Sequence, residues 1–203
     1  MMIWIKRLFK AILFVIIVYA AGRVGVVYFS SQLVGERAPY LQSLTQDSVT
    51  VQWQTRENRM GVLKYGLHPD NLNYTLLEDG VGKVHSITAT TLHPDTRYYY
   101  SVGDISGYKD PDPRYDWFRT MPADDADKPA RIWVIGDSGQ PGEVSRDVRD
   151  AMLNWVAKNP RENNEYLDLW IGLGDLAYRS GTNEQFQKAL FDTYPTILRN
   201  QSL

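Results

Sequence analysis

Two short motifs hold the residues of this sequence that are best suited to chemistry. The first is Gly-Asp-Ser-Gly at 136–139, and the second is Gly-Asp-Leu-Ala-Tyr at 174–178. Each follows a short apolar run, residues 131–135 and residues 167–173, of the length of a buried β-strand. A Gly-Asp pair after a strand is commonly a turn or a helix N-cap. Its repetition after two successive runs indicates a shared site.

The side chains that such a site would use are Asp137, Asp175 and Tyr178. Two carboxylates in one crevice repel each other unless a cation lies between them. Carboxylate and phenolate oxygens are hard ligands, which suit a divalent or trivalent metal ion. We therefore predict a metal site at Asp137, Asp175 and Tyr178, with flanking glycines that let the backbone turn sharply.

Ser138 suggests a different chemistry, nucleophilic catalysis by a serine esterase. That chemistry needs a downstream histidine base. The chain has three histidines, His68, His85 and His93, and none follows Ser138. The esterase hypothesis is therefore set aside, and His85 and His93 are expected to be structural.

The elements around the two motifs alternate between strand and helix. Residues 144–157 and residues 184–194 place apolar side chains close to helical spacing. The order strand, helix, strand, helix implies parallel strands joined by a right-handed crossover. In such units the working residues gather beyond the carboxyl ends of the strands. Asp137 and Asp175 are therefore expected to lie near each other.

The preceding part of the chain has a period of two instead of 3.6. Val49, Val51 and Trp53 alternate with polar residues, as a half-buried strand requires. Several such short strands favour a β-sandwich, because each has one apolar face that another must cover. Within it, the tyrosines at 98–100 are expected to alternate between core and surface. The predicted strands are residues 49–54, 62–65, 84–90, 97–102 and 115–120.

Residues 1–30 carry the features of a membrane-directed segment. Basic residues at 6–10 precede an apolar run at 11–22, which alone suits a cleaved secretory signal. Residues 8–29 together are long enough to cross a bilayer. We favour an uncleaved anchor over a secreted product. In both cases the basic end stays in the cytoplasm, and residues 31–203 are exported to the periplasm or the cell exterior.

Composition excludes several classes of protein. The 203 residues include 22 basic and 24 acidic side chains, for a formal net charge of −2. The first 30 residues contain basic and no acidic side chains, so the remainder is distinctly acidic. This argues against a nucleic-acid partner. The absence of cysteine excludes a disulfide framework and a thiolate metal site.

Over residues 37–203, these features together resemble the N-terminal portion of a purple acid phosphatase, a calcineurin-like metallophosphoesterase. The segments at 37–42, 49–53 and 92–100 resemble the family's fibronectin type III-like N-terminal domain. The two Gly-Asp motifs match its first and second metal motifs, Gly-Asp-x-Gly and Gly-Asp-x-x-Tyr. The expected organisation is a β-sandwich at 37–122, a linker at 123–130 and an incomplete α/β metallophosphoesterase domain at 131–203.

The resemblance implies a dinuclear metal centre, made of iron with a second iron, zinc or manganese. Asp137 would bind the first, ferric ion, Asp175 would bridge both ions, and Tyr178 would bind the ferric ion. The implied reaction is hydrolysis of phosphate monoesters by a metal-held hydroxide.

The sequence departs from the family in its later motifs. Gly-Asn-His-Glu/Asp, a lone histidine and Gly-His-x-His are absent, and no histidine follows His93. We therefore expect an N-terminal fragment that is inactive by itself, because its metals would be short of ligands. The alternative is a non-catalytic, membrane-anchored β-sandwich binding module with a vestigial catalytic remnant.

Overall fold

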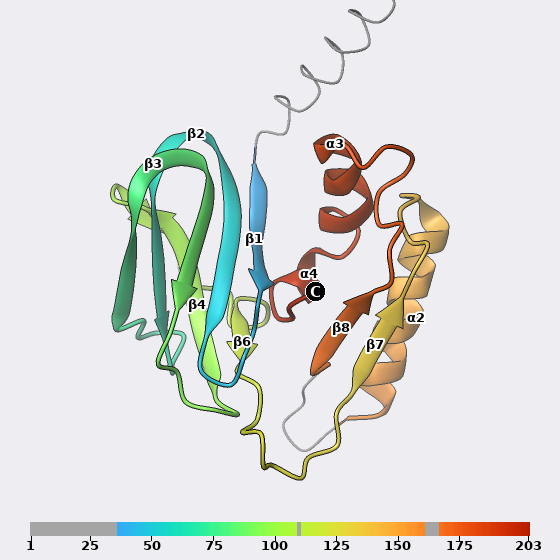
Figure 1. Ribbon diagram of the computed structural model, residues 1–203, viewed down its shortest axis with the longest axis horizontal. Helices are drawn as coiled ribbons and strands as arrows, with labels where there is room; N and C mark the ends of the chain where they lie inside the picture. Colours follow the sequence, from blue (N-terminus) through green and yellow to red (C-terminus); the bar gives the residue numbers. More distant parts are fainter. Residues whose placement is uncertain (1–35, 109–110, 161–166) are drawn as a thin grey trace, which may run out of the picture.

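The structure, a computed structural model, describes residues 36–108, 111–160 and 167–203 (Figure 1). The predicted membrane segment at 1–30 lies outside these residues. Among the residues described, no helix has the length and apolar character needed to cross a membrane. Figure 1 shows an antiparallel β part on one side and a mixed α/β part on the other, with β1 (Arg37–Gln42) between them.

The antiparallel part is built around two long, bent strands, β2 (Val49–Gly66) and β3 (Tyr74–Ala89). The first half of β2 pairs with β1 and with the end of β3, where Val49 is opposite Ala89. The second half pairs with the start of β3 and with β4 (Arg97–Asp104). The six strands are β1 (Arg37–Gln42), β2 (Val49–Gly66), β3 (Tyr74–Ala89), β4 (Arg97–Asp104), β5 (Gly107–Tyr108) and β6 (Trp117–Arg119).

The bend in β2 and β3 produces the two layers of a β-sandwich. The pairing register shifts between Gln54 and Arg59, and irregularities of this kind let a strand turn from one layer into the other. Sequence reasoning expected separate strands at 49–54 and 62–65, and it missed the first part of β3. That expectation was wrong in detail, because the β2–β3 ribbon continues through segments that resemble turns.

The core lies between the two layers and follows the predicted alternation. Val49, Val51 and Trp53 are all buried on one face of β2. Tyr98 and Tyr100 are buried, whereas Tyr99 between them is partly exposed, which confirms the expected alternation. These side chains are the apolar faces that the two layers hide from water.

The α/β part begins with a parallel strand–helix–strand unit. β7 (Ile132–Ile135) pairs in parallel with β8 (Leu169–Gly172), from Ile132 opposite Leu169 to Ile135 opposite Gly172. Instead of the single helix expected at 184–194, there are two short helical turns followed by a third that starts at Pro195. Proline suits the first position of a helix because its missing N–H has no partner there. The elements are β7 (Ile132–Ile135), α2 (Glu143–Lys158), β8 (Leu169–Gly172), α3 (Asn183–Phe186), a π-helix (Gln187–Phe191) and α4 (Pro195–Leu198).

Side-chain contacts tie β1 to the helical turns of the α/β part. The Arg37 guanidinium donates to Gln187 Oε1 at 2.9 Å and to Asn183 Oδ1 at 2.6 Å. The same group lies over the Phe191 ring, 3.8 Å from its centroid, and Tyr40 packs on that ring from a centroid distance of 4.8 Å. One arginine therefore joins the edge of the sandwich to two helical segments.

A second set of contacts joins residues 199–200 to the sandwich. Arg199 pairs with Asp116 at 2.7 Å, and its carbonyl accepts a hydrogen bond from the buried Tyr100 hydroxyl at 3.0 Å. Asn200 Nδ2 donates to the carbonyls of Tyr115 and Trp117 at 2.6 and 3.0 Å. Most of these groups are buried, so the contacts fix the two parts against each other.

Among the residues that the structure describes, the parallel pair β7–β8 is covered on one face only. Trp170 is fully buried, whereas Ile132, Val134 and Leu173 are 49%, 50% and 71% exposed. A sheet with one open apolar face gains less from burial than the sandwich, whose layers cover each other.

We therefore expect β7 and β8 to open more readily than β2. In native-state hydrogen exchange of the full chain, the amides of β7 and β8 should show a lower free energy of opening than those of Val49–Gly66. Equal protection in both parts would contradict this expectation.

Candidate metal site

The two Gly-Asp motifs lie side by side where β7 and β8 end. The backbone N–H of Leu173 donates to the Ile135 carbonyl at 2.9 Å, and that of Asp137 donates to the Gly174 carbonyl at 3.3 Å. Asp137 and Asp175 both have left-handed backbone conformations, with φ of 54° and 52°. Aspartate tolerates this region better than most residues. The parallel pairing therefore places the two aspartates next to each other, as the sequence predicted.

The third predicted residue, Tyr178, links the two carboxylates. Its hydroxyl lies within hydrogen-bonding distance of Asp137 Oδ1, and it is 2.9 Å from Asp175 Oδ2. A phenol has one proton to donate, so the two carboxylates share it. The structure thus brings together all three residues that were predicted from their spacing.

The close approach of the two motifs explains why the first motif ends in a glycine, Gly139. A Cβ atom at this position would lie 2.5 Å from both the Ala177 nitrogen and the Asp175 carbonyl oxygen. The Gly139 carbonyl also accepts a hydrogen bond from the Tyr178 N–H at 3.0 Å. Sequence reasoning assigned the glycines to sharp turns and to room near the ions. At Gly139 the room is instead needed for the backbone of the second motif.

The carboxylates change the acidity of the phenol. The hydrogen bond with Asp137, and next that with Asp175, raises the pKa of Tyr178 well above its ordinary value. Both bonds favour the neutral phenol, and both negative charges disfavour the phenolate. Without a bound cation, Tyr178 is therefore a hydrogen-bond donor to Asp137 and Asp175.

The donor set suits part of the coordination sphere of a hard cation. Two carboxylates and a phenol supply the oxygen ligands that such ions prefer. Within the ranges that the structure covers, however, no three histidine, aspartate or glutamate side chains form a group able to hold a metal ion. His85 is fully buried in the sandwich, away from this site. The described residues therefore provide a partial site.

An aromatic cluster packs on one face of β7 and β8, the two strands that precede the aspartates. Sequence reasoning did not identify this cluster. Trp133 of β7 stacks on Trp170 of β8 with ring centroids 5.2 Å apart. Tyr194 contacts Trp170 edge-on, with a centroid distance of 5.0 Å. The tryptophans occupy paired positions of two neighbouring strands, which is the signal that could have revealed the cluster.

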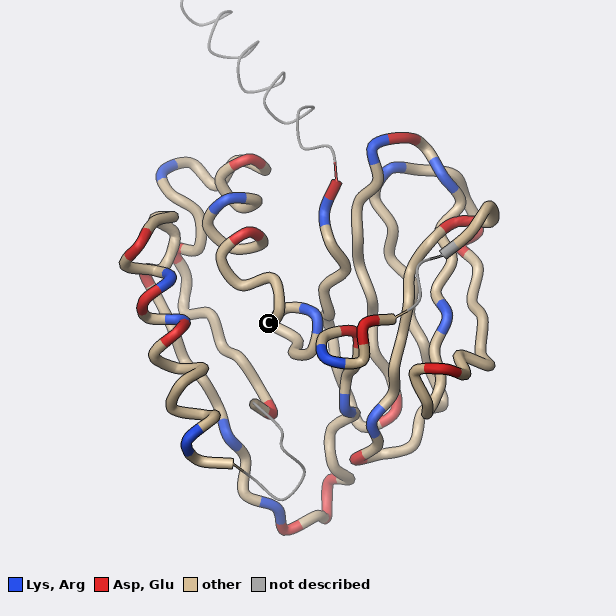
Figure 2. The backbone as a smooth tube through the Cα atoms, turned by 180° about the vertical axis from the view of Figure 1, so that it is seen from behind, with Lys and Arg blue, Asp and Glu red and all other residues tan. Residues whose placement is uncertain are grey.

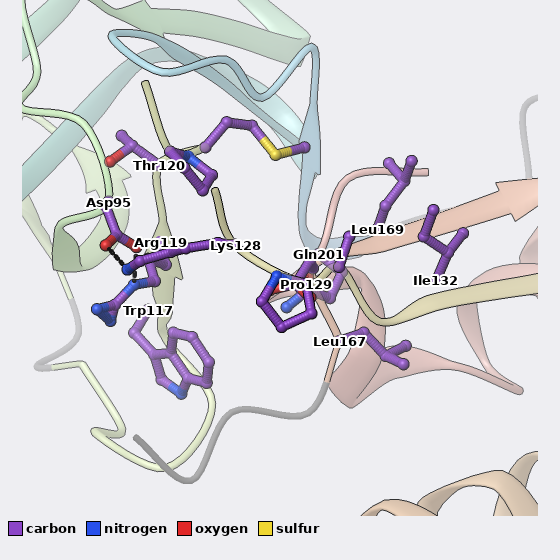
Figure 3. Close-up of a pocket in the computed structure, with 14 residues that line it drawn as sticks. Asp95, Trp117, Arg119, Thr120, Lys128, Pro129, Ile132, Leu167, Leu169 and Gln201 are labelled. Carbon is purple, nitrogen blue, oxygen red and sulfur yellow. Dashed lines mark hydrogen bonds and ion pairs between the residues drawn. The ribbon is translucent and has the colours of Figure 1, made fainter. Parts of the chain in front are cut away.

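A separate cleft lies at the opposite end of β7 and β8, beside the linker (Figure 3). It has a volume of about 510 Å³ and is lined in part by Ile132, Leu169 and Trp117. Its Asp95 accepts from Arg119 at 2.9 Å and also pairs with Lys128. Because these charges are paired with one another and lie away from both motifs, the cleft is not part of the candidate metal site.

Comparison with known proteins identifies the sandwich. The family model for the purple acid phosphatase N-terminal domain matches residues 38–120. Purple acid phosphatase 15 of Arabidopsis thaliana is 32% identical over 108 residues, which are 53% of this chain and 17% of that protein. The predicted resemblance is confirmed: this chain has the N-terminal portion of a purple acid phosphatase-like protein.

Two solved structures illustrate the extent of the fold similarity. The structure of PhoD has a TM-score of 0.50 and 16% identity, and covers 75% of this chain and 30% of the PhoD chain. The fibronectin type III domain of human fibronectin type III domain containing protein 3 has a TM-score of 0.32 and 17% identity, with 47% and 93% coverage. The likeness to PhoD concerns the fold alone, and this chain spans less than a third of that protein.

Replacement of Gly139 should disturb the second motif. We expect Gly139→Ala to destabilise the α/β part by about 1–3 kcal/mol, since its Cβ would meet backbone atoms. Gly142→Ala is the matched control, because nothing lies within 4 Å of its Cβ position. Chemical denaturation of the full chain measures both, and equal effects would refute the proposed close approach.

The shared phenol proton can be tested by titration. With tyrosine labelled at Cζ and Tyr178 assigned through Tyr178→Phe, NMR should show Tyr178 ionising at a higher pH than an ordinary tyrosine. In the double variant Asp137→Asn, Asp175→Asn, ionisation should move to lower pH, because the negative charges that oppose the phenolate are gone. An unchanged titration would contradict the assigned hydrogen bonds.

Proposed function

We propose that the protein is a phosphate monoester hydrolase of the dinuclear-metal purple acid phosphatase type, and that these residues supply part of its metal centre. The observation that supports this is the convergence of three oxygen donors, Asp137, Asp175 and Tyr178, at the ends of two parallel strands. The matched N-terminal domain and the relative that is 32% identical over 108 residues support the assignment to the purple acid phosphatases.

Each residue has a distinct task in this proposal. Asp137 and Asp175 supply the negative charge that holds a cation, and Tyr178, whose hydroxyl contacts both carboxylates, would supply a phenolate ligand to the ferric ion. When bound, the metals would polarise the phosphoryl oxygens and supply the nucleophile. A centre of iron with iron, zinc or manganese needs more ligands than these three, so others must complete it.

The location and partners are further parts of the proposal. The basic and apolar pattern at 1–30 supports export, with an N-terminal membrane anchor or a cleaved signal. The substrate would then be a phosphate ester outside the cytoplasm. Figure 2 shows basic and acidic residues interspersed over the described chain instead of a continuous basic face, which favours a partner other than nucleic acid.

Ferric ion provides a direct test of the site. Added to the full chain, Fe³⁺ should produce a visible tyrosinate charge-transfer band that is lost in Tyr178→Phe. Asp137→Asn and Asp175→Asn should each weaken Fe³⁺ binding at least about tenfold. Asp147→Asn, which changes an exposed carboxylate on α2, is the control and should bind as the original chain does.

Hydrolysis of p-nitrophenyl phosphate separates metal binding from catalysis. Because the described donors are too few for two ions, we expect the 203-residue chain to turn over slowly or not at all. Rapid turnover that is abolished by Asp175→Ala would show that no further ligands are needed. A folded chain without any Fe³⁺ binding would instead favour the non-catalytic β-sandwich binding module.

A further inference from the structure

The start of β1 contacts the helical turn that follows the second Gly-Asp motif. The Arg37 guanidinium donates through Nη2 to Asn183 Oδ1 at 2.6 Å and through Nε to Gln187 Oε1 at 2.9 Å. Gln187 in turn donates through Nε2 to Asp192 Oδ1 at 2.8 Å, so its amide oxygen faces the arginine as an acceptor. Because both donors belong to one rigid, planar group, they define how far α3 and the π-helix lie from β1.

The Arg37 guanidinium is partly withdrawn from water. The Phe191 ring covers it, with a distance of 3.8 Å to the ring centroid, and burial lowers the pKa of Arg37 below its usual value. Bonds from a charged donor are stronger where water is partly excluded. Arg56, on the neighbouring strand β2, is instead exposed and pairs with Glu36 at 3.6 Å. The two arginines at this edge of the sandwich therefore differ in how they are held.

The turn that receives Arg37 is itself bonded to the loop at 179–182. Gln185 Oε1 accepts hydrogen bonds from the N–H groups of Ser180 and Thr182, at 3.0 and 3.1 Å. The Thr182 hydroxyl caps α3 by accepting from the Gln185 N–H at 3.3 Å. The loop is thereby fixed to the first turn of α3, so a displacement of α3 would also displace the loop.

Two backbone hydrogen bonds then fix Tyr178 from both sides. The Gly181 N–H donates to the Ala177 carbonyl at 3.1 Å, and Gly181 has a φ of 62°, which glycine adopts without strain. The Tyr178 N–H donates to the Gly139 carbonyl at 3.0 Å. Tyr178 is therefore held by the first motif on one side and by the turn of α3 on the other.

We propose that Arg37 is a positioning residue of the candidate metal site, which acts on Tyr178 through α3, and that this support is a function of the sandwich. This role rests on the proposed function, in which the Tyr178 oxygen is a ligand of the ferric ion. Figure 1 shows β1 as the strand of the sandwich that faces the helical turns. Through Arg37, the sandwich thus helps to determine where one of the three metal ligands lies.

The expected consequence of losing this contact is altered geometry at a site that keeps all its ligands. Without the guanidinium, α3 and the loop at 179–182 lose their fixed distance from β1. The Tyr178 oxygen then occupies a wider range of positions relative to Asp137 and Asp175. Metal binding weakens when a ligand is less well oriented, even if its chemistry is unchanged.

Fe³⁺ binding to the full chain measures this effect. Arg37→Ala should bind Fe³⁺ about three- to tenfold more weakly and show a weaker tyrosinate charge-transfer band. Arg56→Ala removes an exposed arginine from the neighbouring strand and should bind as the original chain does. The comparison requires unchanged hydrogen exchange of β2, β7 and β8, which excludes unfolding as the cause. Equal Fe³⁺ affinity in Arg37→Ala and the original chain would overturn the proposal.

Gln185→Ala breaks the same connection at a second point and leaves Arg37 intact. If both residues act through the loop at 179–182, the double variant Arg37→Ala, Gln185→Ala should weaken Fe³⁺ binding by less than the product of the two single effects. Single effects that simply multiply would contradict the connection through α3. Because Gln185 lies outside the sandwich, its variant also tests the connection if Arg37→Ala does not fold.

A measurement without metal separates this role from the proposed function. With tyrosine labelled at Cζ, the Tyr178 resonance of the metal-free chain at neutral pH should shift in Arg37→Ala and not in Arg56→Ala, because the contacts of its hydroxyl with the two carboxylates change. A shift in a chain that binds no Fe³⁺ would support the positioning role and refute the metal site. An unchanged Tyr178 resonance in Arg37→Ala would overturn the positioning role, whatever the chain binds.

Discussion

The parallel pairing of β7 and β8 is the constraint on which the candidate metal site depends. Parallel strands end at the same edge of a sheet, so residues that follow them emerge together. Here Ile135 is opposite Gly172, and the two loops continue the pairing through the bond from Asp137 N–H to the Gly174 carbonyl. In an antiparallel pair the same two motifs would lie at opposite ends.

The sandwich helps to hold β7 and β8 in place through the helical turns that pack between them and β1. Its edge strand β1 holds α3 and the π-helix through Arg37, and its interior holds Arg199 through Tyr100 and Asp116. The helical turns, in turn, carry Tyr194 against Trp170 of β8. A continuous set of contacts therefore runs from the core of the sandwich to the strands that position the aspartates.

The sequence was most informative where a single period or spacing determined the structure. The alternation at Val49, Val51 and Trp53 predicted the buried face of β2, and the distance from Asp175 to Tyr178 predicted their contact. The continuity of β2 and β3 could not be predicted, because it depends on pairing between residues far apart in the sequence, such as Val49 and Ala89. Gly139 was recognised as part of a motif, but its close approach to Ala177 is a tertiary contact that no local pattern reveals.

The carboxylates in the two parts of the protein differ in how fully they are hydrogen-bonded. In the sandwich, both carboxylate oxygens of Glu78 accept hydrogen bonds from backbone N–H groups, and Oε2 also lies 2.6 Å from His85 Nδ1. In the α/β part, one phenol proton serves two exposed carboxylates, so negative charge is left over. The open apolar face of β7 and β8 belongs to the same unit. Among the described residues, the excess negative charge and the exposed apolar side chains thus lie close to the same Gly-Asp motifs, and the excess negative charge supports the proposed metal site.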